Sequence, residues 1–261
     1  MAAVNADPFP RCFVGWDVGG WDCDHNPRSR DAIVILNADL RIVGGPWRGN
    51  LRRAINAART PRQWLKALFT HCQADLPAGR LHATMAIDTP LGFSVGFTRL
   101  VTGRGHRGPV GPSQDNPYLY REAERMLIAH GLRPLSPLKD MIGSQATKGM
   151  HVIAKFTPEA KQCGVWSDGA LLTAIEAYPS PCGRSVVIGG LLDRYRAGEP
   201  NGAAANWIPA IDHPDKRDAL ICALVAYLFS TDPQALVPPP VAIPPGEGWI
   251  WLPRDALPPD A

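Results

Sequence analysis

The sequence predicts an α/β fold, in which strands and helices alternate around a sheet. Short apolar runs that end in turn residues are typical of buried strands, and several occur along the chain. One of them, 83–88, follows an amphipathic helical pattern, and an earlier strand-like run precedes that pattern. A strand, a helix and another strand in succession are typical of a right-handed parallel crossover. We therefore expect a sheet that contains parallel strands.

The first three expected strands form a meander. Residues 12–17 read as a strand that breaks at Gly19 and Gly20, and residues 32–36 read as the next. A turn at 37–39 then leads into a third strand over 41–43.

A helix begins after Thr60 and leads into the fourth strand. Thr60 suits the N-cap, Pro61 the first helical position and Gln63 the partner position of a capping box. Apolar residues then recur at helical spacing as far as Cys72. The fourth strand, 83–88, ends at a Thr-Pro pair.

The middle of the chain is expected to be a helical insertion, spanning about 99–168. Residues 98–117 are rich in Gly, Pro, Arg and His without periodicity, which predicts a long loop. A helix should follow from Asn116 to Gly131, and a further helical stretch should cover 145–162.

The last third returns to the sheet. A fifth strand is expected at 171–176, a helix at 183–196 and the strongest helix of the chain at 212–229. From residue 233 to 261 prolines are frequent, with one strand-like piece at 248–252, which predicts a tail that wraps a single domain of residues 1–261.

Acidic residues at the ends of expected strands are the main functional signal. Side chains alternate along a strand, so Asp17 and Asp88 each come last on one face of their strands. If these strands are parallel neighbours, the two carboxylates meet at the carboxyl edge of the sheet, where α/β proteins bind ligands. Close carboxylates repel unless a cation lies between them.

Two further acids belong to this prediction. Asp218 lies on an otherwise apolar stripe of the last helix, and Glu176 ends the fifth strand. Small residues on that stripe, among them Ala219 and Cys222, would let the helix lie close against the sheet. Asp215 shares the stripe but equally suits the first helical turn, so both roles stay open. Each acid taken singly is explained by closing a turn. Together they predict a site for Mg²⁺ or Mn²⁺, since hard cations prefer oxygen ligands.

Composition narrows the class of partner. The chain has 27 Lys and Arg against 24 Asp and Glu, a formal net charge of +3, so no overall field indicates nucleic acid. The N-terminal residues lack the pattern of a secretory signal, and the longest apolar run is shorter than the roughly 20 residues that span a bilayer. Six cysteines without a CxxC pair suit a reducing compartment. We expect a cytoplasmic protein with no membrane partner.

Six short motifs, in order, resemble the blocks of a predicted nuclease family, the domain of unknown function 429. They are VGWDVGG from Val14, AIDTPLG from Ala86, REAE from Arg121, IEAYP from Ile175, DAL from Asp218 and GEGWI from Gly246. The resemblance spans nearly the whole chain. It implies a ribonuclease H-like fold, a five-stranded mixed sheet flanked by helices, with acids on the first strand, the fourth strand and the last helix, which are Asp17, Asp88 and Asp218 here. Glu176 and Arg121 also fall in motifs that match this family, so the resemblance implies that both belong to the site.

These observations predict a metal-dependent nuclease, a hydrolase. Asp17, Asp88 and Asp218 would hold the metal, with Glu176 as a further catalytic residue, acting on an unspecified nucleic acid. Substrate contacts are expected from Arg121 and from the loop arginines, which are Arg99, Arg104 and Arg107. A solvated loop explains the loop arginines equally well. Lys139, Lys148 and Lys155 could extend such a basic surface, but as scattered charges they are expected to face solvent.

Two other classes of function remain open from the sequence. One is a non-catalytic module that binds nucleic acid or protein on the same fold. The other is a phosphotransferase, because the turn 15–20 resembles the phosphate loop of sugar kinases and actin-like ATPases. Trp21 stands where such loops usually carry a hydroxyl residue, which places this class third.

Overall fold

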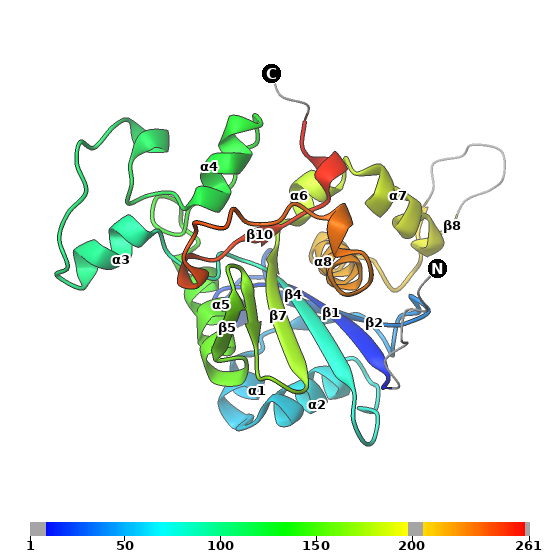
Figure 1. The fold of residues 1–261 in the computed structure, drawn as a ribbon. Helices are drawn as coiled ribbons and strands as arrows, with labels where there is room; N and C mark the ends of the chain where they lie inside the picture. Colours follow the sequence, from blue (N-terminus) through cyan, green and yellow to red (C-terminus); the bar gives the residue numbers. More distant parts are fainter. Residues whose placement is uncertain (1–8, 198–205, 259–261) are drawn as a thin grey trace, which may run out of the picture.

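The computed structural model describes residues 9–197 and 206–258 and shows an α/β arrangement around a mixed sheet (Figure 1). The predicted α/β class and mixed sheet are confirmed. The first eight and last three residues of the predicted domain and tail lie outside the described residues. The strands are β1 (Arg11–Asp17), β2 (Asp31–Asn37), β3 (Trp47–Gly49), β4 (His82–Asp88), β5 (Glu159–Gln162), β6 (Val165–Ser167), β7 (Leu172–Ala177), β8 (Arg196–Ala197), β9 (Asn206–Trp207) and β10 (Ile250–Trp251).

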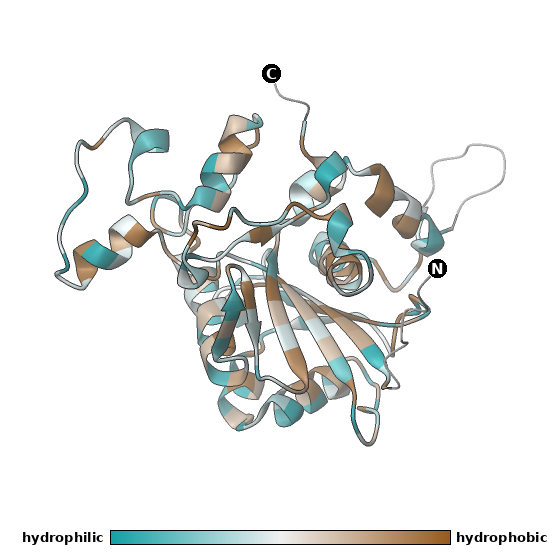
Figure 2. Ribbon diagram, in the orientation of Figure 1, coloured by the Kyte–Doolittle hydropathy of each residue, from teal (hydrophilic) through white to brown (hydrophobic). Residues whose placement is uncertain are grey.

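The helices cover both faces of the main sheet. They are α1 (Arg52–Ala57), α2 (Pro61–His71), α3 (Val95–Val101), α4 (Glu122–Ala129), α5 (Gly143–Phe156), α6 (Pro179–Cys182), α7 (Val186–Leu192) and α8 (Pro214–Thr231). One apolar core joins the sheet to α1, α2 and α5, and a second joins it to α4, α6, α7 and α8. In Figure 2 the central strands are largely hydrophobic, as expected of a sheet buried between two layers.

The main sheet has eight strands, in the order β3-β2-β1-β4-β7-β6-β5, with β10 paired to β7. Strands β1, β4 and β7 are parallel, whereas β2 and β3 on one side and β6 and β5 on the other are antiparallel. The prediction of five strands was therefore wrong. The three additional strands are the short β5, β6 and β10. Strands this short show little alternation of apolar and polar residues, so the sequence pattern does not reveal them.

The third strand differs in position from the prediction. The predicted strand 41–43 contributes only an isolated bridge, between Leu36 and Ile42. The chain then turns at Gly44, whose φ of +69° suits glycine, and pairing with β2 resumes at Trp47. The turn at Gly44, rather than the apolar residues at 41–43, determines where β3 pairs with β2.

The crossover between β1 and β4 is parallel, as predicted, and contains α2. Thr60 accepts a hydrogen bond from the backbone N–H of Gln63 at 3.2 Å, and Pro61 occupies the first turn. The predicted start of this helix is confirmed. The helix buries Trp64, Leu65, Leu68 and Phe69 against the sheet, with Trp64 stacked on Phe156 of α5 at 5.4 Å.

The region expected to be a helical insertion is partly strand. Helix α4 begins at Glu122 rather than near residue 117, and α3 occupies the first part of the predicted loop. Helix α5 ends at Phe156, because Pro158 disfavours helical geometry at the residue before it. Residues 159–167 then form β5 and β6, which pair beside β7. Exposed Glu159 and Lys161 suit β5 to its place at the edge of the sheet.

Helix α8 lies directly against β1, and the residues in the middle of the helix are almost all buried. A Cβ at Gly15 would lie 1.8 Å from the carbonyl oxygen of Ala219 and 2.4 Å from the nitrogen of Ala223. The predicted close approach of a small-residue face is confirmed. The predicted single apolar stripe was wrong, because α8 is covered on its other side by α6 and α7 and is buried from Ala219 to Ala226. The predicted helix 183–196 is α7 followed by a 3₁₀ turn.

The tail runs out along the molecule and returns, with its tip at a 3₁₀ turn, Pro245–Glu247 (Figure 1). Val237 donates to the carbonyl of Leu252 at 3.0 Å and Leu236 bridges Pro253, so the two halves of the tail lie together. The returning half supplies β10, which pairs in parallel with Glu176 and Ala177 of β7. In the described part of the chain, no helix has the length and apolar character needed to cross a membrane.

Candidate active site

Asp17 and Asp88 are neighbours at the carboxyl edge of the sheet. They end β1 and β4, and the parallel register pairs them directly. The same register places Glu176 of β7 opposite Ile87, one residue short of the Asp17 level. The predicted meeting of the two aspartates is therefore confirmed, and it follows from the alternation of side chains along parallel strands.

Within the described residues, no positively charged side chain offsets the negative charge of Asp17 and Asp88. Burial raises the pKa of Asp17 well above its usual value of 3.8, and repulsion from Asp88, Asp215 and Asp218 raises it further. Burial likewise raises the pKa of Asp88, followed by repulsion from Asp218 and Glu176. Each acid is thus more easily ionised when a cation is added.

Asp218 approaches the pair from α8. Burial raises its pKa, and Arg217, whose Nε lies 3.5 Å from Asp218 Oδ1, opposes that shift. Its side chain is 34% exposed, so Asp218 can change position more easily than the strand residues. Repulsion from Asp218 is among the causes that raise the pKa of both Asp17 and Asp88, so its charge acts on both strand residues.

A cavity of about 240 Å³ opens beside the two strand ends. Its acidic wall consists of Asp17, Asp88, Glu124 and Glu176, and Asp218 does not line it. The remaining lining is largely apolar and includes Leu135, Ile142, Ile250 and Tyr178. We call this space the carboxylate cavity.

One polar atom of the carboxylate cavity has no protein partner. Thr89 follows Asp88 directly, is 5% exposed and lines the cavity. Its Oγ1 is buried and forms no hydrogen bond within the described residues. Because buried hydroxyl groups are nearly always hydrogen-bonded, this atom indicates a missing partner in the cavity.

Glu176 and Arg121 form a buried ion pair. The two terminal nitrogens of Arg121 donate to the two carboxylate oxygens of Glu176 at 2.8 and 2.6 Å, and Leu91 N–H donates at 2.8 Å. Arg121 also binds Glu124, through Nε at 2.9 Å and through a terminal nitrogen at 2.5 Å. Burial alone would lower the pKa of Arg121, but the two glutamates raise it well above its usual value.

This ion pair corrects two predictions. Arg121 is 1% exposed and its donors are occupied, so it does not face a substrate as predicted. Burial raises the pKa of Glu176, and Arg121 opposes that shift, so Glu176 is held in place rather than open to a ligand. The group of Arg121, Glu124 and Glu176 keeps one uncompensated negative charge beside the cavity.

The loop arginines do not line the carboxylate cavity. Arg99 and Arg107 line a separate cavity, and Arg104 is exposed on the loop. Their predicted contact with substrate therefore stays a prediction, and the structure places Arg99 and Arg107 in a cavity other than that of the carboxylates. Asp215, whose role the sequence left open, is engaged by Arg48 Nε at 2.7 Å and by the backbone N–H of Arg30 at 3.2 Å.

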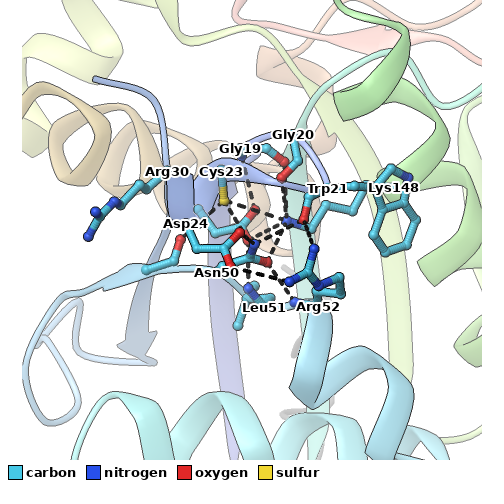
Figure 3. A network of polar contacts seen from close by, with 12 residues as sticks. Gly19, Gly20, Trp21, Cys23, Asp24, Arg30, Asn50, Leu51, Arg52 and Lys148 are labelled. Carbon is cyan, nitrogen blue, oxygen red and sulfur yellow. Dashed lines mark hydrogen bonds and ion pairs between the residues drawn. The ribbon is translucent and has the colours of Figure 1, made fainter. Parts of the chain in front are cut away.

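The turn after β1 is held by a buried lysine (Figure 3). Lys148 of α5 is fully buried, with its Nζ 2.5 Å from Asp31 Oδ2 and 3.2 Å from the carbonyl oxygens of Gly19 and Gly20. The expectation that Lys148 faces solvent was wrong. Asp31 also accepts from the N–H of Gly19 at 3.0 Å, so this backbone donor is already used. A phosphate loop needs such donors unoccupied, which weakens the resemblance to sugar kinases.

No family model, curated protein or solved structure was found to match the chain. The fold and the site together define an α/β protein with an acidic cavity at the carboxyl edge of its parallel strands. Within residues 9–197 and 206–258, no three His, Cys, Asp or Glu side chains are already grouped closely enough to hold a metal ion.

Sequence reasoning missed two cavity residues, Glu124 and Thr89. Glu124 lies three positions after Arg121, at the capping-box position of α4, and its carboxylate accepts from the N–H of Arg121 at 2.8 Å. That spacing is a detectable signal for a helix start, but it does not show that the helix end is buried. Thr89 precedes Pro90 and looks like an ordinary turn residue.

Proposed function

We propose that the chain is a metal-dependent nuclease that hydrolyses phosphodiester bonds, with Asp17, Asp88 and Asp218 as ligands for Mg²⁺ or Mn²⁺. The observation that carries this proposal is the direct pairing of Asp17 with Asp88 at the carboxyl edge of the sheet. Among the described residues, no Lys or Arg pairs with either carboxylate, and ionising both without a cation is costly. The order of the motifs that resemble a nuclease family supports the same conclusion.

The donor set suits a hard divalent cation. Carboxylate oxygens are the ligands that Mg²⁺ and Mn²⁺ prefer, and the unpartnered hydroxyl of Thr89 lies beside Asp88. Asp218 lies on helix α8 and its side chain is partly exposed, so it is the proposed ligand that can move toward a bound ion.

Each residue has a distinct role in this proposal. A bound ion of this kind lowers the pKa of a water and stabilises charge on the leaving oxygen. Asp17 and Asp88 hold the ion from rigid strand ends, and Asp218 completes the set. Glu176, fixed by Arg121, is a positioning residue whose charge raises the pKa of Asp88 and so makes the cavity more attractive to cations. The apolar residues that line the rest of the cavity limit the access of water.

The test combines metal binding with cleavage. Calorimetry with Mn²⁺ and a Mg²⁺-dependent cleavage assay on single-stranded, duplex and junction substrates are run on the wild type and on Asp17→Asn. We expect the wild type to bind Mn²⁺ and cleave, and the variant to lose both while its circular dichroism spectrum is unchanged. Asp75→Asn, which removes an exposed carboxylate between α2 and β4, should behave as the wild type.

Three results would contradict the proposal in different ways. Full cleavage by Asp17→Asn would remove the aspartate pair from the chemistry. Binding of oligonucleotides by a wild type that takes up no Mn²⁺ would favour a non-catalytic binding module. Thermal stabilisation by a nucleoside triphosphate, with no cleavage, would favour a phosphotransferase.

A further inference from the structure

A second cavity, of about 520 Å³, lies between α3, α4 and the outer half of the tail. Three arginines line it: Arg99 from α3, Arg107 from the following loop and Arg125 from α4. Its size is in the range of ligand pockets, roughly 300–1,000 Å³. We call it the arginine cavity. Sequence reasoning identified Arg99 and Arg107 but missed Arg125, which only the fold brings beside them.

The arginine cavity keeps a net positive charge. Glu247 also lines it, but its two carboxylate oxygens accept from the backbone N–H groups of Val95, at 3.1 Å, and of Glu122, at 2.8 Å. Glu122 faces Arg125 at 3.6 Å as an exposed pair, which is a weak interaction. Within the described residues, no carboxylate pairs with Arg99 or Arg107. Three cations therefore oppose two anions, one of which is already bound to helix N-termini.

Arg125 offers a donor that no protein group uses. Its Nε is buried and has no hydrogen-bond partner among the described residues, while one terminal nitrogen donates to the carbonyl of Asn116 at 3.3 Å. A buried N–H without an acceptor is unfavourable, so Arg125 Nε gains a hydrogen bond if an acceptor enters from outside the chain. Arginine donors match phosphate oxygens in both charge and geometry.

The loop that carries Arg107 is anchored at its base. The hydroxyl of Tyr118 accepts from the N–H of Arg107 and donates to its carbonyl, both at 2.9 Å. Ser94, at the start of α3, donates to the carbonyl of Pro117 at 2.9 Å. These bonds hold residues 94–118, the segment with α3 that projects from the rest of the molecule in Figure 1. Figure 2 shows that the loop after α3 is mostly hydrophilic. The arginines are therefore presented on an anchored segment.

We infer that the arginine cavity is a subsite for the phosphodiester backbone of nucleic acid, separate from the carboxylate cavity. The inference rests on the proposed nuclease function, because it assigns the substrate contacts of that enzyme. Because none of the three arginines lines the carboxylate cavity, they would bind phosphates that flank the cleaved bond, and their effect would be on substrate affinity. Apolar Ile243 and Pro244 line the same cavity and suit contact with sugars.

The experiment measures binding without chemistry. A fluorescein-labelled single strand of about 15 nucleotides is titrated in EDTA, and fluorescence anisotropy gives the affinity at several salt concentrations. The variant carries Arg99→Gln, Arg107→Gln and Arg125→Gln. On single strands, each lost phosphate contact reduces the magnitude of the slope of log K against log salt concentration by about 0.7. For three arginines we expect the magnitude of the slope to fall by about 2, and binding at low salt to be roughly ten- to hundredfold weaker.

Matched controls separate a local effect from a general loss of charge. A second triple variant carries Arg53→Gln, Arg59→Gln and Arg194→Gln, which removes the same charge from exposed positions elsewhere and should keep the wild-type slope. Arg125→Lys keeps the charge but loses Nε, so it should keep the slope and weaken binding. Thermal melting confirms that each variant folds.

The possible outcomes distinguish this inference from the nuclease proposal. Wild-type slope and affinity in the cavity variant would refute the arginine subsite and leave the nuclease proposal standing. Equal losses in both triple variants would also refute it, because binding would then follow total charge. A lower slope in the cavity variant alone supports the arginine subsite, and loss of cleavage in Asp17→Asn with unchanged binding supports the nuclease proposal, whereas a wild type that binds no DNA or RNA refutes both.

Discussion

Replacing Gly15 with alanine tests whether the contact between β1 and α8 is as close as the structure shows. The added Cβ would lie 1.8 Å from Ala219 O and 2.4 Å from Ala223 N. Both atoms belong to the backbone of a buried helix, so no side chain can rotate away. Overpacking a core typically costs about 1–3 kcal/mol, and a backbone obstacle places this case at the upper end, about 3 kcal/mol.

The assay is thermal and urea unfolding of Gly15→Ala beside Gly189→Ala. At about 2–4 °C per kcal/mol for a chain of this size, Gly15→Ala should lower Tm by roughly 6–12 °C. Gly189 lies inside α7, where an added Cβ would meet nothing within 4 Å, so its alanine variant should be stabilised by about 0.5–1 kcal/mol. An unchanged or raised Tm for Gly15→Ala would refute the close packing of α8 on β1, and with it the placement of Asp218.

Two further predictions concern buried charge. The pKa of Asp17 is higher in the folded protein than its usual 3.8, so the folded state binds more protons and stability falls as pH rises above that value. Asp17→Asn, melted in EDTA, should therefore raise Tm at pH 7, with a gain that vanishes as the pH approaches 3.8; a gain independent of pH would contradict the electrostatic cause. Lys148→Met should cost about 3–5 kcal/mol in urea unfolding because Asp31 is left buried and unpaired. Adding Asp31→Asn should recover part of the loss, exposed Lys66→Met should cost little, and the absence of recovery would show that the lysine acts through packing alone.

The acidic pair could be predicted from the sequence because it depends on local rules. Strand alternation puts Asp17 and Asp88 last on their faces, and the helix between them makes the crossover parallel, so register alone brings them together. The small residues around Ala219 likewise predicted the approach of α8. Each of these inferences needs only the period of a strand or a helix.

The remaining features depend on distant partners that no local pattern contains. Arg121 was expected to bind substrate, yet Glu176, 55 positions away, occupies its guanidinium. Lys148 was expected at the surface, yet it is buried because Asp31 and two glycine carbonyls surround it. A charged residue looks the same in the sequence whether it faces water or a buried counter-charge.

Glu247 lies close to the end of the chain, but it caps helices that begin 152 and 125 residues earlier, at Val95 and Glu122. During synthesis, both helices therefore emerge long before their shared acceptor is made. One backbone N–H at the start of each helix therefore lacks this acceptor until the segment around Glu247 has been made and has folded back. The arginine cavity, which Glu247 lines, is therefore complete only once this late segment has been made and has folded back.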